Sequence, residues 1–273
     1  MFDSIGEMAR FGPLLVLALI GIEATALHWQ KRRGYDLKES AATLGILAGQ
    51  LVLRGATASL LAPIFAAIYQ HRLLTIPMKG LTPWLVLFFA VEFLYYWMHR
   101  ASHRVHWLWA SHQVHHSTQR LNFSSAYRLG WTATLSGSWL FFTPLILLGF
   151  HPASVFGMLA LNLGYQFLLH TETIGSLGPL EGWINTPAGH RVHHAAAGVP
   201  FDQNFGGMLL VFDRLFGTYT AEPRERKLAY GIAGRPVSYN PIRIAFAGWF
   251  WLLHELRDAR SPRAVWHALF DAP

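Results

Sequence analysis

Histidines cluster in this chain at spacings that suit metal binding. The chain has 273 residues and 15 histidines, as many histidines as acidic residues, and it has no cysteine. Six histidines fall between His99 and His116, and three more between His190 and His194. Imidazole nitrogens bind zinc, copper and iron, whereas the missing cysteine excludes thiolate sites and disulfides. The distribution therefore predicts a metal site built from imidazole nitrogens.

Three short motifs place histidines on helix faces. His99 and His103 are four residues apart, so their side chains share one face. The segments 112–116 and 190–194 both read His-x-x-His-His, and adjacent helical residues point about 100° apart, so each segment can reach two ions. His170 stands alone. Nine imidazoles exceed what one ion needs and suit two, with iron, zinc and copper all open at this point.

Two further groups bear on this site. Glu92 is N-terminal to His99 and lies on the same face of the predicted helix. A carboxylate buried in a membrane span needs a polar partner. A ligating histidine that donates its second ring N–H to Glu92 would supply one. His106, three residues beyond His103, is undecided as a ligand. The remaining histidines are expected to be ordinary polar residues near membrane interfaces: His28, His71, His151, His254 and His267.

The elements that must position these histidines are predicted to be membrane spans. The chain is 52% hydrophobic and 14% charged, whereas soluble proteins carry roughly 25% charged residues. A spanning helix needs about 20 mostly apolar residues. We therefore expect an all-α integral-membrane bundle of about four to five transmembrane helices, with 242–256 as an interfacial or packing helix. The candidate spans are Phe11–Trp29, Thr43–Tyr69, Leu81–Met98, Trp131–Phe150 and Ala153–His170.

Charge predicts the orientation of this bundle. Lys31, Arg32 and Arg33 follow the first apolar stretch and should lie in the cytoplasm. Alternating spans then place the arginine-rich segments 99–130 and 171–242 on the same side. All the histidine motifs thus form a cytoplasmic histidine-rich di-metal cap. The net charge of +7 suits anionic lipid better than nucleic acid, because so few residues are charged.

The chain reads as a single membrane-embedded domain, because no repeat or linker interrupts it. Residues 1–98 would hold the N-terminal spans, residues 99–220 the catalytic core, and residues 221–273 a cytoplasmic or interfacial C-terminal segment.

At these residues the chain resembles the fatty acid hydroxylase / sterol desaturase superfamily of integral-membrane di-iron oxygenases. The matching stretch runs from about residue 91 to 220 and includes the three histidine motifs, Asn204-Phe-Gly and Phe212-Asp213-Arg-Leu-Phe-Gly217. Within this superfamily, the short sequence motifs at residues 177–181 and 230–232 resemble most the branch that contains alkylglycerol monooxygenase. Gly189 and Phe205 depart from the pattern of that branch.

The resemblance implies an activity and a set of site residues. The enzyme would use O₂ to hydroxylate or desaturate a C–H bond of a lipid such as a fatty acyl chain, a sterol or an ether lipid. Glu92, Asn204 (through a water) and Asp213 would be outer partners of the metal ligands. Two iron ions would be held by nine histidines: His99, His103, His112, His115, His116, His170, His190, His193 and His194.

Electrons must reach such a centre from outside the chain. The sequence has no Gly-x-Gly-x-x-Gly dinucleotide motif and no cysteine for an iron–sulfur cluster. The donor would be a ferredoxin-like or cytochrome-type protein, or an external reduced pterin if the ether-lipid branch is the right one.

Two other classes of protein also use histidines in membranes. A metal-binding or transport protein would carry polar side chains through the full depth of its bundle, and here midspan polar residues such as Glu23 and Asn162 are few. A bis-histidine haem protein would need opposed histidines on different spans. The histidine motifs are predicted to cluster at one membrane face, which favours the oxygenase over both of these alternatives. The lipid, and the choice among hydroxylation, desaturation and ether cleavage, stay open.

Overall fold

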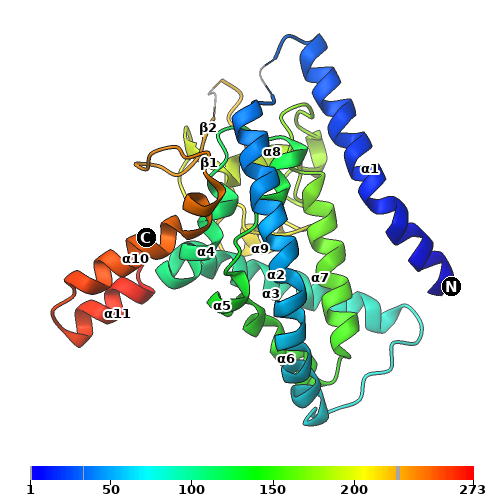
Figure 1. Cartoon of the computed structure of the whole chain (residues 1–273). Coiled ribbons are helices and arrows are strands. Elements are labelled where there is room, and N and C mark those ends of the chain that lie inside the picture. Colours follow the sequence, from blue (N-terminus) through cyan, green and yellow to red (C-terminus); the bar gives the residue numbers. More distant parts are fainter. Residues whose placement is uncertain (1, 33, 226–227) are drawn as a thin grey trace.

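The computed structural model is mostly helical (Figure 1). It describes residues 2–32, 34–225 and 228–273, so Arg33, used above for the orientation, lies outside the described residues. Four long helices form the frame: α1 (Phe2–Trp29), α2 (Leu37–Gln70), α3 (Thr82–Arg104) and α7 (Pro152–Phe167).

Helices α2, α3 and α7 pack around an apolar core, while α1 diverges from them toward its N-terminus (Figure 1). Phe65 of α2, Leu87 and Val91 of α3 and Val155 of α7 are buried in this core. The local sequence sets where two of these helices begin. The Asp36 carboxylate accepts from the backbone N–H groups at the start of α2, and α7 begins at Pro152.

Clear membrane spans are fewer than the sequence predicts. Among the described residues, one helix, Gly12–Trp29, is long and apolar enough to cross a bilayer. Helix α2 adds a second if its halves, Leu37–Leu53 and Gly55–Gln70, which meet at 45°, count as one span. The four to five spans are therefore not confirmed.

The prediction of one continuous span over 131–150 is wrong. This segment forms α5 (Ala133–Ser136), the 3-10 helix η2 (Ser138–Phe142) and α6 (Thr143–Leu148). Gly137 adopts a left-handed φ of 81°, which ends α5, and Gly149 at φ 130° ends α6. Pro144 lies in the first turn of α6 and lacks the N–H that would continue a helix from before it.

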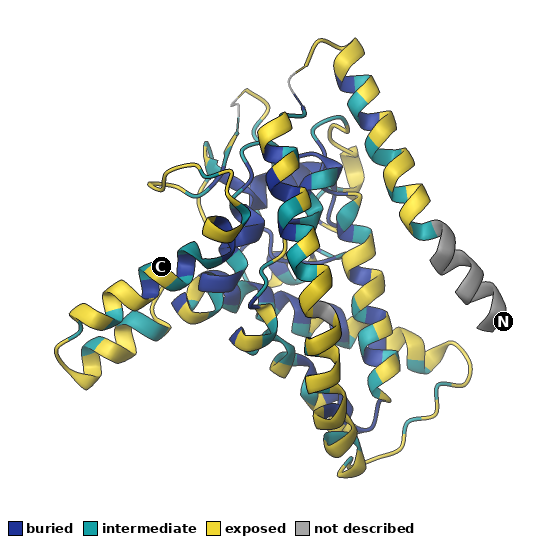
Figure 2. Ribbon diagram, viewed as in Figure 1, coloured by how far each residue is buried: buried dark blue, intermediate teal, exposed yellow. Residues whose placement is uncertain are grey.

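Shorter elements build a cap above the long helices. They are α4 (His106–His116), η1 (Phe123–Tyr127), η3 (Gly178–Leu180), α8 (Pro187–His193), α9 (Val211–Leu215) and the antiparallel pair β1 (Ala195–Ala197) and β2 (Ala229–Tyr230). Figure 2 shows buried residues gathered where α4 and α8 lie, and exposed residues along α1 and lower α2.

A helical hairpin of α10 (Pro241–Asp258) and α11 (Pro262–Phe270) projects from the cap (Figure 1). The apolar stretch 242–256 therefore does form a helix, and it packs against α4 and α2. Ile244, Ala245, Gly248 and Leu252 make its buried face, whereas Phe250 and Leu253 are exposed.

Candidate metal centre

The nine predicted histidines lie together in two groups within which the candidate ligand atoms are all within 4.8 Å of one another. The first cluster is His99, His103, His112, His116 and His193. The second cluster is His115, His170, His190 and His194. The two clusters adjoin, because the ring centroids of His116 and His194 are 4.4 Å apart. His106 belongs to neither cluster.

These rings come from four helices or from the residues just beyond them. The spacing of the histidines along the sequence decides which cluster each ring joins. The last turns of α3 carry His99 and His103 into the first cluster. Helix α4 sends His112 and His116 to the first cluster and His115 to the second. The motif at the end of α8 divides the opposite way, with His193 in the first cluster and His190 and His194 in the second. His170 lies three residues beyond the end of α7 and completes the second cluster. Adjacent histidines thus diverge as the helical geometry predicts.

The ring nitrogens approach one another as ligands of a shared cation would. In the first cluster, His112 Nε2 lies 3.1 Å from His99 Nε2 and 3.3 Å from His116 Nε2. In the second cluster, His190 Nε2 lies 3.1 Å from both His170 Nε2 and His194 Nε2. Nitrogens bound at about 2.1 Å and at right angles to one ion would be about 3.0 Å apart.

Several ring nitrogens in these clusters are buried without any hydrogen-bond partner. They are His103 Nε2, His193 Nε2, His190 Nδ1 and His194 Nδ1. A buried polar atom without a partner costs about 1–3 kcal/mol. The close nitrogen pairs in both clusters, with the unpartnered Nε2 atoms of His103 and His193 in the first cluster, fit two cations, each held by imidazoles.

In four of the cluster histidines, the Nδ1 atom, on the side of the ring away from Nε2, is hydrogen-bonded to a backbone carbonyl. A carbonyl only accepts, so each such Nδ1 carries the proton and leaves the lone pair on Nε2. The acceptors for His99, His115, His170 and His193 are the carbonyls of Phe205, Arg128, Gln166 and Gln203, at 2.8, 3.3, 2.7 and 3.0 Å respectively. The Asp202 carboxylate lies 3.4 Å from His103 Nδ1.

Burial keeps these imidazoles neutral. Desolvation lowers the pKa of His99 from 6.5 to about 3 and that of His115 to about 4. The same cause lowers the pKa of His103 and His112 well below 6.5, and neighbouring imidazoles add to it. Metal binding requires the neutral ring, so at neutral pH the clusters are in the binding form.

Glu92 does not accept a hydrogen bond from a ligating histidine. Its carboxylate accepts from the Asn162 amide and, at 2.9 Å each, from the N–H groups of Met208 and Leu209. It precedes His99 by seven residues, about 10 Å along a helix, which explains why the ring is beyond its reach. Glu92 therefore ties α3 to α7 and to the loop before α9.

Asp213 acts on the first cluster through the backbone. It accepts from the N–H groups of Phe205 and Gly206 at 2.7 and 2.8 Å and from the Thr218 hydroxyl at 2.7 Å. This fixes Phe205, whose carbonyl accepts from His99.

Asn204 also acts through the backbone. Its amide donates to the carbonyls of Gly189 and Thr220 at 2.9 and 2.8 Å, and its oxygen accepts from the Thr220 N–H at 2.9 Å. The water contact from Asn204 to a metal stays a prediction. Asn204 fixes α8 next to His190, and its own φ of 56° is one that asparagine tolerates.

The sequence did not predict most of the hydrogen-bond acceptors of the histidine rings, because a residue of any type can supply a backbone carbonyl. Asp202 was missed for another reason. It lies about 100 residues from its partner His103 along the chain, and only the fold brings them together.

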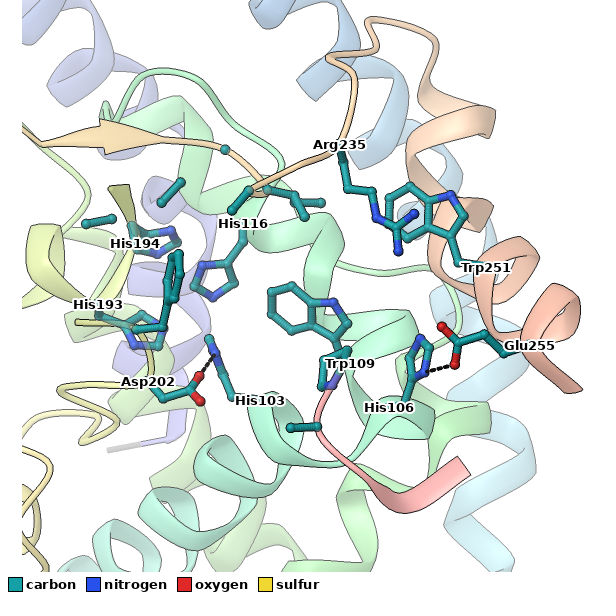
Figure 3. A pocket seen from close by; sticks show the side chains of 18 residues that line it. His103, His106, Trp109, His116, His193, His194, Asp202, Arg235, Trp251 and Glu255 are labelled. Atoms are coloured by element: carbon teal, nitrogen blue, oxygen red, sulfur yellow. Dashed lines mark ion pairs between the residues drawn. The ribbon is translucent and has the colours of Figure 1, made fainter. Parts of the chain in front are cut away.

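A cavity of about 310 Å³ opens beside the clusters (Figure 3). One wall is formed by cluster histidines, including His103, His116 and His193. The opposite wall holds Trp109, Trp251 with the Arg235 guanidinium stacked 3.9 Å from its ring centroid, and the pair of His106 and Glu255.

The sequence of this chain is similar to those of known proteins. Residues 84–218 match the fatty acid hydroxylase family. Human alkylglycerol monooxygenase is 42% identical over 178 residues, which cover 65% of this chain and 39% of that protein. The zebrafish (Danio rerio) alkylglycerol monooxygenase is 39% identical over 76% of this chain and 46% of its own length.

A bacterial relative matches over a larger share of its own length. The ornithine lipid hydroxylase OlsE of Rhizobium tropici is 31% identical over 76% of this chain and 64% of its own length. The chain spans less than half the length of the two alkylglycerol monooxygenases it matches. No solved structure matches the chain significantly. The family match, the relatives and the histidine motifs agree: residues 84–218 of this chain form a domain of the fatty acid hydroxylase family.

Proposed function

We propose that this chain is a membrane-bound non-haem di-iron oxygenase that uses O₂ to hydroxylate a C–H bond of a lipid. The observation that carries the proposal is the pair of adjoining all-imidazole clusters, with five and four histidines. Imidazole ligation without thiolate or carboxylate suits a redox-active metal with open positions, whereas a structural zinc needs only four ligands. The relatives named as lipid monooxygenases and hydroxylases support the same class of reaction.

The nine histidines would hold the two iron ions. When bound, such an iron pair supplies the O₂-dependent oxidation of an unactivated C–H bond. The protein's own part is to fix the ligands and keep bulk water away. Backbone carbonyls lock the ring tautomers at His99, His115, His170 and His193, so each presents Nε2 inward. Burial of these rings keeps them neutral and excludes competing protons.

The lipid and the electron donor would come to the protein separately. The multi-pass topology and the cytoplasmic position of the cap belong to this proposal, since they follow from apolar patterning and the arginine-rich segments. The donor would be a ferredoxin-like or cytochrome-type protein or a reduced pterin, because the chain carries no electron-transfer module of its own.

Two alternatives use the same site. Desaturation of a sterol or fatty acyl chain would need a second hydrogen abstraction at the neighbouring carbon. A histidine-rich metal-binding or transport role would bind metal without consuming O₂. Product analysis separates the first from hydroxylation, and an oxygen electrode separates the second.

The ligand assignment is tested by removing one imidazole ring from each of the two His-x-x-His-His motifs. We expect His112→Ala and His193→Ala to lose iron and lipid oxidation while the protein still inserts in membranes. His254→Ala is the matched control, because His254 is exposed and belongs to neither cluster. Iron is quantified per chain, and products are sought from a 1-O-alkylglycerol, an ornithine lipid and a sterol. Wild-type iron content and turnover in both cluster variants would refute the assignment.

A further inference from the structure

A histidine–carboxylate pair lies in the wall of the cavity, outside both clusters. His106 Nδ1 is 3.2 Å from Glu255 Oε2 (Figure 3). The side chain of His106 is 5% exposed and that of Glu255 is 50% exposed. Both residues line the cavity that His103, His116 and His193 also line. The pair therefore joins a half-exposed carboxylate to a buried imidazole in the space beside the clusters.

The chemistry proposed for this site consumes protons. Hydroxylation follows the balance R–H + O₂ + 2e⁻ + 2H⁺ → R–OH + H₂O, with both electrons supplied by the external reducing donor. The O–O bond breaks, one oxygen atom joins the lipid carbon, and the other takes two protons and leaves as water. A buried centre that excludes bulk water needs a defined route for those protons.

The other titratable side chains that line this cavity are already committed. The cluster histidines would use their lone pairs on metal. Asp202 is paired with Arg104 at 2.9 Å and with His103 at 3.4 Å. The Arg235 guanidinium has only hydrogen-bond donors and lies over the Trp251 ring. An imidazole bound to a half-exposed carboxylate, in contrast, can take a proton on one nitrogen and release one from the other.

We propose that Glu255 and His106 relay protons from solvent into the cavity beside the histidine clusters. This inference rests on the proposed oxygenase function. Glu255 collects the proton at the surface, His106 Nδ1 receives it, and Nε2 delivers one to the cavity. His106 is thus a proton-relay residue and not a metal ligand.

The test measures O₂ consumption by the full-length, iron-loaded protein in lipid nanodiscs, after reduction with dithionite and removal of the excess reductant, which would itself consume O₂. His106→Asn and Glu255→Gln keep the size and polarity of the pair but remove proton transfer. We expect both to slow O₂ consumption about tenfold to a hundredfold, to change the H₂O/D₂O rate ratio, and to retain wild-type iron. Free imidazole should restore the rate of His106→Gly.

A second pair on the same helix is the matched control. His254 and Asp258 of α10 also form a histidine–carboxylate pair, at 3.4 Å, but both are exposed and neither lines the cavity. His254→Asn and Asp258→Asn should leave the rate and the isotope ratio unchanged.

A merely structural contact between α4 and α10 predicts other results. Unchanged rates and isotope ratios in His106→Asn and Glu255→Gln would overturn the relay, as would loss of iron in both or failure of imidazole to rescue. Glu255→Gln alone decides the matter if the buried variant does not fold, because Glu255 is half-exposed.

The relay and the proposed function can fail separately. O₂ consumption that slows in the variants, without oxidation of any lipid, would support the relay and contradict lipid hydroxylation. Lipid oxidation at wild-type rates in the variants would overturn the relay alone. No O₂ consumption by the reduced wild-type protein would overturn both.

Discussion

At the scale of single residues, helical spacing is what made the candidate ligands predictable. Histidines at i, i+3 and i+4 have directions fixed by the helix itself, so the motifs at 112–116 and 190–194 divide between two clusters as geometry requires. Their outer partners were not predictable, because four are carbonyls brought close only by tertiary structure. The predicted hydrogen bond from a ligating histidine to Glu92 was wrong. The prediction considered the helix face that Glu92 shares with His99 but not their separation along the helix axis.

Asp213 is the residue whose conservative replacement should be most informative. Asp213→Asn replaces one carboxylate oxygen by an NH₂ group, which cannot accept from the N–H of Phe205 or Gly206. We expect a loss of about 1–3 kcal/mol in unfolding free energy and weaker metal binding in the first cluster, through Phe205 and His99. Denaturant unfolding and metal titration measure these. Asp258→Asn, at an exposed pair, is the control. Equal behaviour of the two variants would contradict this role.

Acid should destabilise the metal-free protein. Burial lowers the pKa of His99 to about 3 and of His115 to about 4, so between these values and 6.5 the unfolded chain binds protons that the folded chain does not. Stability is then lost as pH falls below about 6.5, by up to about 1.4 kcal/mol per pH unit for each such histidine.

Buried carboxyl groups oppose this trend. Burial raises the pKa of Asp213 to about 6 and also raises that of Asp202, which favours the folded state as pH falls, but such carboxyl groups are fewer than the cluster histidines whose pKa is lowered. Thermal unfolding in detergent at pH 7.5 and pH 5 measures the net effect. A midpoint that is equal or higher at pH 5 would contradict the expected sign.

At the scale of elements, the length of the apolar stretches predicted helices where α1, α2 and α3 lie. It failed over 131–150, where composition is apolar but Gly137 and Gly149 take positive φ angles that end helices. Average hydropathy does not register those two positions, so the segment appeared as one span. Helix α10 was predictable as a helix, but its docking on α4 depends on a close approach at Gly248 that only the structure reveals.

Gly248 should therefore be intolerant of any side chain. A Cβ at this position would lie 2.5 Å from the carbonyl oxygen of Ala110 and would collide with Gln113. We expect Gly248→Ala to separate α10 from α4 and to lower the thermal midpoint, although alanine favours helices. Gly157→Ala in α7, where a Cβ meets nothing within 4 Å, should be neutral or raise it. Equal midpoints would show that the contact between α4 and α10 is not tight.

At the scale of the whole molecule, the histidine cap lies at one end of the long helices. The sequence predicted this from charge and apolar patterning. The predicted number of spans is not confirmed, because short buried helices and membrane helices share the same composition. What the long helices establish is a frame that brings segments from α3, α4, α7 and α8 to one site.

The absence of cysteine makes the predicted topology easy to test. Single cysteines replace two exposed residues, Ser176 in the loop after α7 and Lys79 in the loop before α3. The positive-inside prediction places Ser176→Cys in the cytoplasm and Lys79→Cys on the other side. A membrane-impermeant maleimide applied to intact cells should label only Lys79→Cys. Labelling of both, or of Ser176→Cys alone, would contradict the orientation.

The central claim is that two imidazole clusters hold iron and oxidise a lipid with O₂. The most direct measurement supplies ¹⁸O₂ to the reduced, iron-loaded protein with a panel of lipids and quantifies metal per chain. The account predicts two irons per chain and one ¹⁸O atom in the lipid product. Clusters that retain only zinc, or a lipid product whose new oxygen comes from water, would contradict it.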